Sequence, residues 1–186
     1  MRLALIDNYD SFTWNLVEIL RQECPYAWEL LPNRGLNASE LMGYDKIIIS
    51  PGPGLPEEWH LPVLILELAA HADILGICLG HQALALALGA RLKQAGVYHG
   101  IQSRVFITDP DERLFQGLQT PVLVGRYHSW VVDENTLPDD LLVTSRSEDG
   151  LVMGLRHRRL PLRGLQFHPE SYMTPQGAHM LRNWLL

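Results

Sequence analysis

The stretch DILGICLGHQALALAL, residues 73–88, decides the fold because it passes within a few residues from a strand pattern to a helix pattern. Asp73–Ile77 is a short apolar run typical of a buried strand, and Leu79–Leu88 is apolar enough for a helix packed against a sheet. Cys78 stands at the turn between them. A strand followed at once by a helix is half of a βαβ unit, so this stretch predicts an α/β protein with a parallel sheet.

The rest of the chain extends this pattern in two ways. The first half repeats the alternation. Strands are expected at Arg2–Ile6, Trp28–Leu31 and Lys46–Ser50, and helices at Asp10–Pro25 and Glu58–Ala70. The second half holds short strands separated by turn residues, at Ser103–Thr108, Val122–Tyr127, Leu141–Ser147, Leu151–His157 and Leu162–Phe167, and a last helix with Pro175 near its first turn. We expect a single α/β domain over residues 1–186, with three layers (α/β/α), a mainly parallel central sheet and antiparallel extensions.

Composition excludes several classes of protein. The 186 residues are 47% hydrophobic and 19% charged, which is typical of one globular domain and not of a disordered chain. A net charge of −6 disfavours nucleic acid or an anionic membrane as the main partner. No apolar run approaches the ~20 residues that span a bilayer, and the run Leu3–Ile6 is too short for a signal peptide, so we expect a cytoplasmic protein.

Cys78 is the first candidate for chemistry. Gly76 and Gly80 flank it at two places on either side, and small residues there let the backbone fold back at a tight strand-to-helix turn. The turn would present the thiol at the carboxyl end of the sheet and at a helix N-terminus, which favours the reactive thiolate. A lone cysteine is more often a small core side chain, and this is how we interpret Cys24 beside Pro25.

A base for this thiol is expected in the tripeptide His168-Pro169-Glu170. In an extended segment, side chains two places apart project to the same side, so His168 and Glu170 can face one site. His168 would take and return a proton while Glu170 orients the imidazole, which makes a Cys-His-Glu triad with Cys78. The tripeptide alone is a weak signal, and its position at the end of a predicted strand strengthens it.

The loop Ser50-Pro51-Gly52-Pro53-Gly54 follows another predicted strand. Its glycines leave backbone N–H groups free to approach a ligand, which suits an oxyanion hole. A plain Pro-Gly turn is the competing interpretation. The loop is not a phosphate loop, because the lysine and hydroxyl that should follow are missing.

Three motifs together resemble the class I glutamine amidotransferases: Gly76–Gln82, Ser50–Gly54 and Gln166–Ser171. Leu5–Thr13 and Gly125–Ser129 are similar to the subfamily that serves chorismate-using synthases in anthranilate and aminodeoxychorismate (p-aminobenzoate) synthesis. The resemblance runs from end to end of the chain, in the order that the family has.

The resemblance implies a glutaminase subunit. Cys78 would attack the side-chain amide of L-glutamine to form a thioester and release ammonia, with His168 and Glu170 completing the triad. Its oxyanion hole would be the backbone N–H groups of Gly52 and Leu79. The glutamine would be held by residues of the same pocket, namely Gly52, Gly54, Gln82, Ser129 and Trp130.

The resemblance also implies a partner. The ammonia would pass to a chorismate-using synthase subunit on another polypeptide. No cofactor is expected in this chain, and no metal site, since no pair of histidines four apart on a helix has a third ligand; a metal ion, Mg²⁺, would belong to the synthase.

Some positions depart from the family. Ile101 and Gln102 stand where a lysine and then a small residue are usual, Trp130 stands where leucine is commoner, and residues 55–60 lack the glycine usually found just after the acidic pair. Two other functions remain open. One is a free-standing hydrolase or peptidase of the same superfamily, and the other is a non-catalytic regulatory module that has kept the fold.

Overall fold

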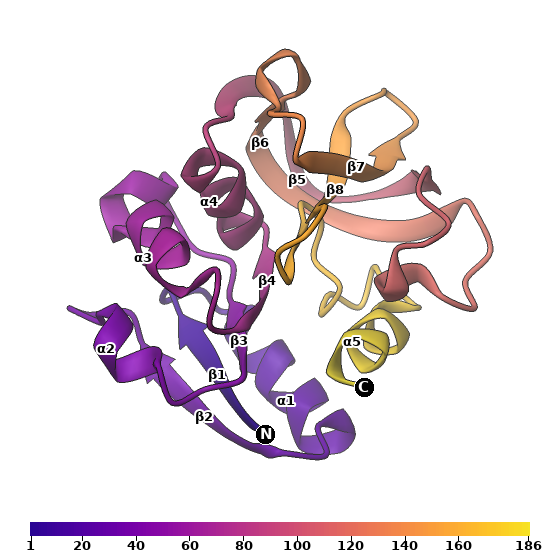
Figure 1. Cartoon of the computed structure of the whole chain (residues 1–186). Helices are drawn as coiled ribbons and strands as arrows, with labels where there is room; N and C mark the ends of the chain where they lie inside the picture. Colours follow the sequence, from indigo (N-terminus) through magenta and orange to yellow (C-terminus); the bar gives the residue numbers. More distant parts are fainter.

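The strands form one nine-stranded sheet in the computed structural model, which describes residues 1–186 (Figure 1). The order across the sheet is β2-β1-β3-β4-β9-β8-β7-β5-β6. Five neighbouring strands are parallel: β2 (Ala27–Pro32), β1 (Arg2–Asp7), β3 (Lys46–Ile49), β4 (Asp73–Ile77) and β9 (Leu162–Leu165). Four continue it in antiparallel pairing: β8 (Val152–His157), β7 (Leu141–Ser147), β5 (Arg91–Ile107) and β6 (Val122–Asp133).

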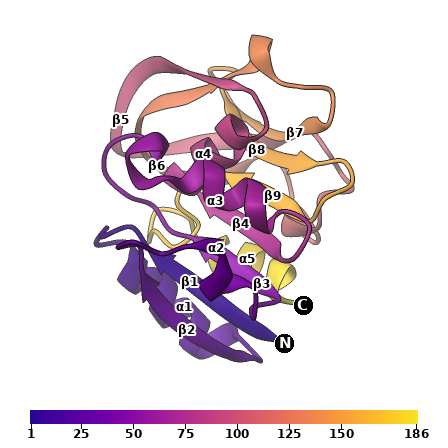
Figure 2. The ribbon, with the colours of Figure 1, turned by 60° about the vertical axis from the view of Figure 1, so that its left-hand side comes forward.

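Helices cover both faces of the parallel part, as the two views in Figures 1 and 2 show. On one face lie α1 (Thr13–Glu23) and α5 (Gly177–Leu185), and on the other lie α2 (Ala38–Leu41), α3 (Leu61–Leu68) and α4 (Leu79–Ala87). Successive strand residues point to opposite faces, so Leu5 of β1 packs in the α1 and α5 core while Ile6 packs in the α3 and α4 core. The three-layer α/β fold with antiparallel extensions is therefore confirmed.

The bounds of some elements differ from those predicted, either because the strand is largely exposed or because a turn interrupts the helix. β5 and β6 are much longer than expected and form a ribbon with register shifts at Gln94/Tyr98 and His99/Ile101. The helix expected over Glu58–Ala70 is split, because His60 takes a left-handed conformation (φ 54°) between η1 (Pro56–Trp59) and α3. The short helix α2 and the single turns η2 (Arg113–Phe115) and η3 (Glu134–Thr136) were not expected.

The last helix begins later than Pro175, at Gly177. A Cβ on Gly177 would lie 1.6 Å from the carbonyl oxygen of Pro169, so only glycine lets the start of α5 approach this segment so closely. The segment after β9, which carries His168 and Glu170, is thereby packed between the sheet and α5.

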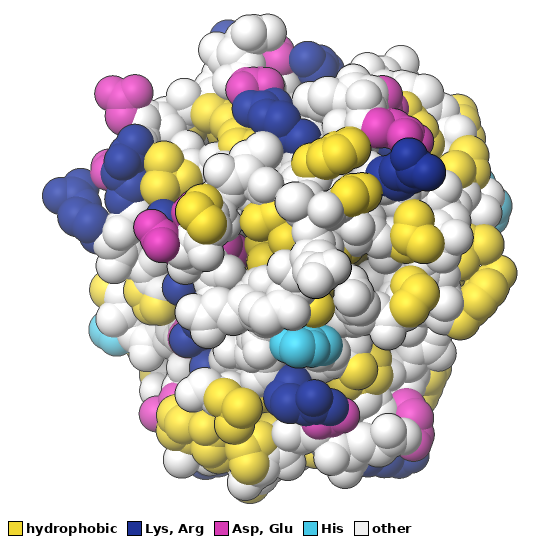
Figure 3. All heavy atoms as spheres, turned by 90° about the vertical axis from the view of Figure 1, so that its right-hand side faces the viewer, with side chains coloured by type: hydrophobic (Ala, Val, Ile, Leu, Met, Phe, Trp, Pro, Cys, Tyr) yellow, Lys and Arg dark blue, Asp and Glu magenta, His cyan; other side chains and the backbone are white.

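The surface and the helices add two observations. On the face shown in Figure 3, basic and acidic side chains lie next to one another, so this face presents no continuous basic track. None of the helices combines the length and the apolar character needed to cross a membrane.

Candidate active site

Cys78 lies at the elbow between β4 and α4. Its backbone is strained, with φ 51° and ψ −96°, and its N–H donates to the carbonyl of Leu165 at 2.8 Å. A Cβ at Gly76 would lie 2.3 Å from backbone atoms of Gly80, and one at Gly80 would lie 2.6 Å from the carbonyl oxygen of Ile49. Both glycines are therefore required by close backbone approach, as their spacing around Cys78 predicts.

His168 and Glu170 form a buried pair. The imidazole Nδ1 and the carboxylate Oε1 are 2.7 Å apart, and the two side chains are 2% and 0% exposed. The backbone of His168 is fixed by a bridge to Gly125 of β6, its N–H donating to the Gly125 carbonyl at 3.0 Å, and by Thr174, whose hydroxyl donates to its carbonyl at 2.6 Å. The pairing of these two side chains, expected from their spacing, is present in the structure.

The protonation of His168 follows from its neighbours. Burial lowers its pKa, but the negative charges of Glu170 and Cys78 outweigh burial and hold the pKa well above its ordinary value. Its Nε2 atom is buried and has no hydrogen-bond partner in the chain. The site is therefore built for an imidazolium beside the thiol, with one ring nitrogen bound to the carboxylate and the other free for chemistry.

Two aromatic rings pack on this imidazole. Phe12 and Tyr127 approach it edge-on, with ring centroids 4.7 Å and 4.9 Å from its own, and 4.6 Å from each other. The Tyr127 hydroxyl is in turn bonded to the Ser171 hydroxyl at 3.1 Å. Sequence reasoning did not find Phe12 or Tyr127, because each comes from an element far along the chain from His168.

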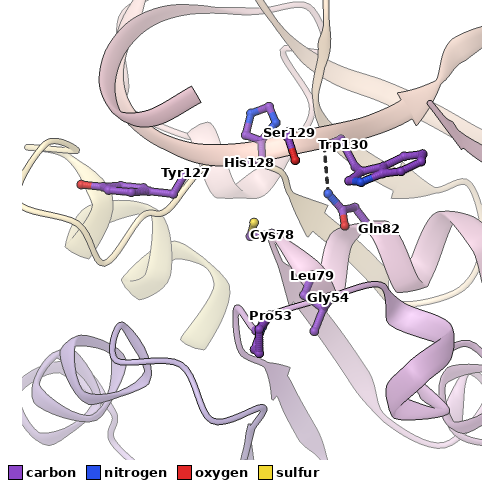
Figure 4. A pocket seen from close by; sticks show the side chains of 10 residues that line it. Pro53, Gly54, Cys78, Leu79, Gln82, Tyr127, His128, Ser129 and Trp130 are labelled. Carbon is purple, nitrogen blue, oxygen red and sulfur yellow. Dashed lines mark hydrogen bonds between the residues drawn. The ribbon is translucent and has the colours of Figure 1, made fainter. Parts of the chain in front are cut away.

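Cys78 opens into a pocket of about 210 Å³ (Figure 4). One wall is the loop after β3, with Gly52, Pro53 and Gly54, and the opposite wall is the β6 segment Tyr127–Trp130. Leu79 and Gln82 of α4 complete the lining. The structure thus gathers around one cavity Cys78 and every residue expected to bind glutamine or an oxyanion, while His168 and Glu170 are buried outside the lining.

Gln82 links α4 to the β6 wall and to the segment after β9. Its side-chain nitrogen donates to the carbonyl of Trp130 at 2.9 Å, the bond drawn in Figure 4, and to the side chain of Gln166 at 3.3 Å. Gln166 also directs its own side-chain N–H to the Cys78 sulfur at 3.6 Å. Gln166 was not expected as a site residue, although it precedes His168 by two places and so had the same spacing signal.

The other two histidines near the thiol are neutral. Burial lowers the pKa of His81 to about 4, and burial together with the Arg126 charge lowers that of His128 to about 3. The His128 ring turns away from Cys78 in Figure 4, and its Nε2 accepts from Arg126 at 3.2 Å. Of the three imidazoles, His168 is therefore the one whose surroundings favour the protonated form. No group of three or more His, Cys, Asp or Glu side chains is placed to hold a metal ion.

The fold and this pocket define a class of protein. A family model, glutamine amidotransferase class-I, matches residues 4–186, and the chain belongs to this family. A solved structure from Thermoplasma acidophilum, described as a candidate GMP synthase subunit, is similar with a TM-score of 0.87 and 29% identity, over 100% of this chain and 92% of that one. The family expected from the motifs is confirmed.

Within the family, the chain is similar to components of two synthases. It is 44% identical over 189 residues to aminodeoxychorismate synthase component 2 of Klebsiella aerogenes, covering 98% of both chains. It is 42% identical over 191 residues to anthranilate synthase component 2 of Mycobacterium tuberculosis, covering 100% of this chain and 82% of the relative.

Proposed function

We propose that the chain is the glutaminase subunit of a chorismate-using synthase, in which Cys78, His168 and Glu170 hydrolyse L-glutamine and the ammonia passes to the synthase. The observation that carries the proposal is the juxtaposition of the strained Cys78 turn with the buried His168–Glu170 pair beside a pocket. This arrangement supplies a nucleophile, an acid and base, and a group that orients the base.

The chemistry proceeds in two halves. In the first, the Cys78 thiolate attacks the side-chain carbonyl of glutamine, and the C–N bond breaks as the His168 imidazolium gives its proton to the departing ammonia. In the second, neutral His168 takes a proton from water, the resulting hydroxide attacks the thioester, and glutamate leaves as the thiolate and imidazolium are restored. Glu170 stabilises the imidazolium in both halves.

The oxyanion of each half would be bound by backbone donors. The N–H groups of Gly52 and Leu79 make no hydrogen bond within the chain, and both residues line the pocket next to Cys78. Free donors at the wall of the cavity are what a developing negative charge needs.

The amino-acid end of glutamine would lie against Gln82, Ser129, Trp130 and Gly54. Gln82 holds the carbonyl of Trp130 at 2.9 Å, which fixes this part of β6 facing the loop that carries Gly54. Trp130, unusual for the family, lies at the same wall of the cavity, with its indole directed away from Cys78 in Figure 4. We therefore expect the departure at this position to leave glutamine binding intact, because contact there is through backbone.

The partner would be a separate synthase subunit that consumes the ammonia. The relatives support this, since each is named as component 2 of a synthase. We further propose that glutamine hydrolysis needs no cofactor in this chain, that a metal ion such as Mg²⁺ belongs to the synthase, and that the complex is cytoplasmic, as two free cysteines suit a reducing compartment.

The experiment measures glutamate release by the purified chain alone, with an anthranilate synthase component 1 and with an aminodeoxychorismate synthase component 1. Stimulation by one partner supports the proposal and assigns the pathway, and stimulation by both indicates that the two synthases share this chain. Strong activity that neither partner changes would instead favour a free-standing hydrolase. Inactivity throughout, with Cys78 unreactive toward an alkylating glutamine analogue, would favour a non-catalytic module.

A further inference from the structure

The loop after β3 offers two free backbone donors in a row. Gly52 and Gly54 each carry an N–H that makes no hydrogen bond within the chain, and the prolines between and before them carry none. Both glycines lie on the wall of the Cys78 pocket. Each of these peptide planes adjoins a glycine, whose backbone rotates at low cost, so the direction of the donors depends on what holds the planes.

A peptide plane is held as soon as its carbonyl is held. The peptide unit is planar and trans, so the N–H points opposite to the carbonyl of the same unit. The N–H of Gly52 is therefore set by the carbonyl of Pro51, and the N–H of Gly54 by the carbonyl of Pro53. Each of these two carbonyls accepts a hydrogen bond from a side chain.

The inner peptide is held from the core. The Ser50 hydroxyl donates to the Pro51 carbonyl at 2.8 Å and accepts from the backbone N–H of Asn8 at 3.0 Å, which fixes the direction of its own hydrogen. The Asn8 side chain donates to the Ser50 carbonyl at 2.9 Å and accepts from Asn33 at 2.7 Å. Ser50 and Asn8 are both 0% exposed, so water does not compete for these bonds.

The outer peptide is held from the surface. The indole N–H of Trp59 donates to the Pro53 carbonyl at 2.8 Å, and its ring stacks on Tyr9 with centroids 5.8 Å apart and planes 29° apart. Tyr9 follows β1 in a left-handed conformation (φ 61°), which its N–H stabilises by donating to the Asp7 carboxylate at 2.9 Å. The half-buried Trp59 is thus fixed on one side by a ring and on the other by the loop.

We infer that Trp59 and Ser50 are positioning residues, which turn the N–H groups of Gly54 and Gly52 toward the substrate at Cys78. Trp59 acts on the outer donor, and Ser50, braced by Asn8, acts on the inner one. The inference rests on the proposed function, in which the Gly52 N–H binds the oxyanion and Gly54 lies against the amino-acid end of glutamine.

Trp59→Phe tests the outer contact most cleanly, since phenylalanine keeps a ring against Tyr9 and removes only the N–H donor. Trp14→Phe is the matched control, because Trp14 lies exposed on α1 and its indole makes no hydrogen bond. Ser50→Ala tests the inner contact, with the melting temperature measured alongside because Ser50 is buried. All proteins are assayed as the complex with the synthase subunit that stimulates the wild type.

The rates of glutamine hydrolysis and of Cys78 alkylation together distinguish loss of a positioned donor from a general loosening of the site. Glutamine hydrolysis passes through an oxyanion, whereas alkylation of Cys78 by iodoacetamide is a displacement at a saturated carbon and builds no oxyanion. We expect Trp59→Phe to raise KM for glutamine about tenfold, because Gly54 lies against the amino-acid end of the substrate, with kcat changed less and the alkylation rate unchanged. We expect Ser50→Ala to lower kcat about tenfold, because Ser50 holds the peptide that carries the Gly52 oxyanion donor, and Trp14→Phe to match the wild type.

The inference is overturned if Trp59→Phe leaves KM unchanged or Ser50→Ala leaves kcat unchanged. It is also overturned if the alkylation rate falls with kcat, which would indicate a disturbed thiol and not a disturbed donor. The outcome is distinct from failure of the proposed function. If the proposed function fails, the wild-type complex itself releases no glutamate. If only this inference fails, the wild-type complex is active and the variants do not show the expected changes.

Discussion

Replacing Gly76 by alanine tests the geometry of the nucleophile turn most severely. The new Cβ would lie 2.3 Å from the carbonyl carbon and oxygen of Gly80, whereas ordinary contacts begin at 3.4 Å. Because these are backbone atoms at the start of α4, the helix must move by about 1 Å relative to β4. Gly76 has an ordinary φ, so the effect is purely steric.

The expected cost has two parts. Overpacking of this kind destabilises a protein by about 3 kcal/mol, which for a chain of this size lowers the melting temperature by about 6–12 °C. A shift of about 1 Å in the nucleophile costs about 100-fold in kcat. Thermal unfolding and glutamate release measure the two effects separately.

Gly43→Ala is the matched control. Its Cβ would lie 3.5 Å from the end of the Arg2 side chain, an ordinary contact, and its φ is ordinary too. We expect its stability to stay within about 0.5 kcal/mol of the wild type. If Gly76→Ala melted within 2 °C of the wild type (roughly 1 kcal/mol) and kept full activity, the close approach described at this turn would be wrong.

Three further predictions concern titrating and strained residues. Glu170→Gln removes the charge that holds the His168 pKa above its ordinary value, so we expect slower thiol alkylation at neutral pH and a midpoint shifted to higher pH; an unchanged pH profile would contradict the pair's role. His81 and His128 are neutral when folded and take up protons when unfolded, so their stabilisation is complete above about pH 6.5 and is lost toward the folded pKa values of about 4 and 3. The raised pKa of His168 acts in the opposite direction and offsets part of this loss, so urea unfolding should give about 3 kcal/mol less stability at pH 5 than at pH 7, and a flat profile would refute this. His60→Gly should keep stability within about 1 kcal/mol, while His60→Val should cost about 2 kcal/mol because a branched side chain resists the left-handed conformation; equal melting temperatures would argue against strain.

The centre of the parallel sheet was predictable because its strands are buried on both faces. A run such as Lys46–Ile49 is buried throughout and reads as a strand on composition alone. The first part of β5 could not be found in this way, since most of the segment 91–102 is exposed and carries no apolar alternation. The break at His60 was also hidden, because its left-handed backbone stands where no glycine marks it.

The chemistry of the site was predictable where it depends on neighbours in sequence. The two glycines around Cys78 and the two-place spacing of His168 and Glu170 are local signals, and the structure places both as expected. Contacts between site residues and segments distant in sequence leave no such local signal. Trp59 meets Tyr9 across 50 positions, and Phe12 meets His168 only because α1 packs beside the end of β9.

The most direct test of the central claim is Cys78→Ser, assayed in the complex with the synthase subunit that stimulates glutamate release. A serine at this turn keeps the fold but is a far weaker nucleophile without thiolate character. Product formation should be lost with glutamine as nitrogen donor and retained with ammonia, because ammonia enters after the step that Cys78 performs. Equal loss with both donors would mean that Cys78 has a structural role and that the proposed mechanism is wrong.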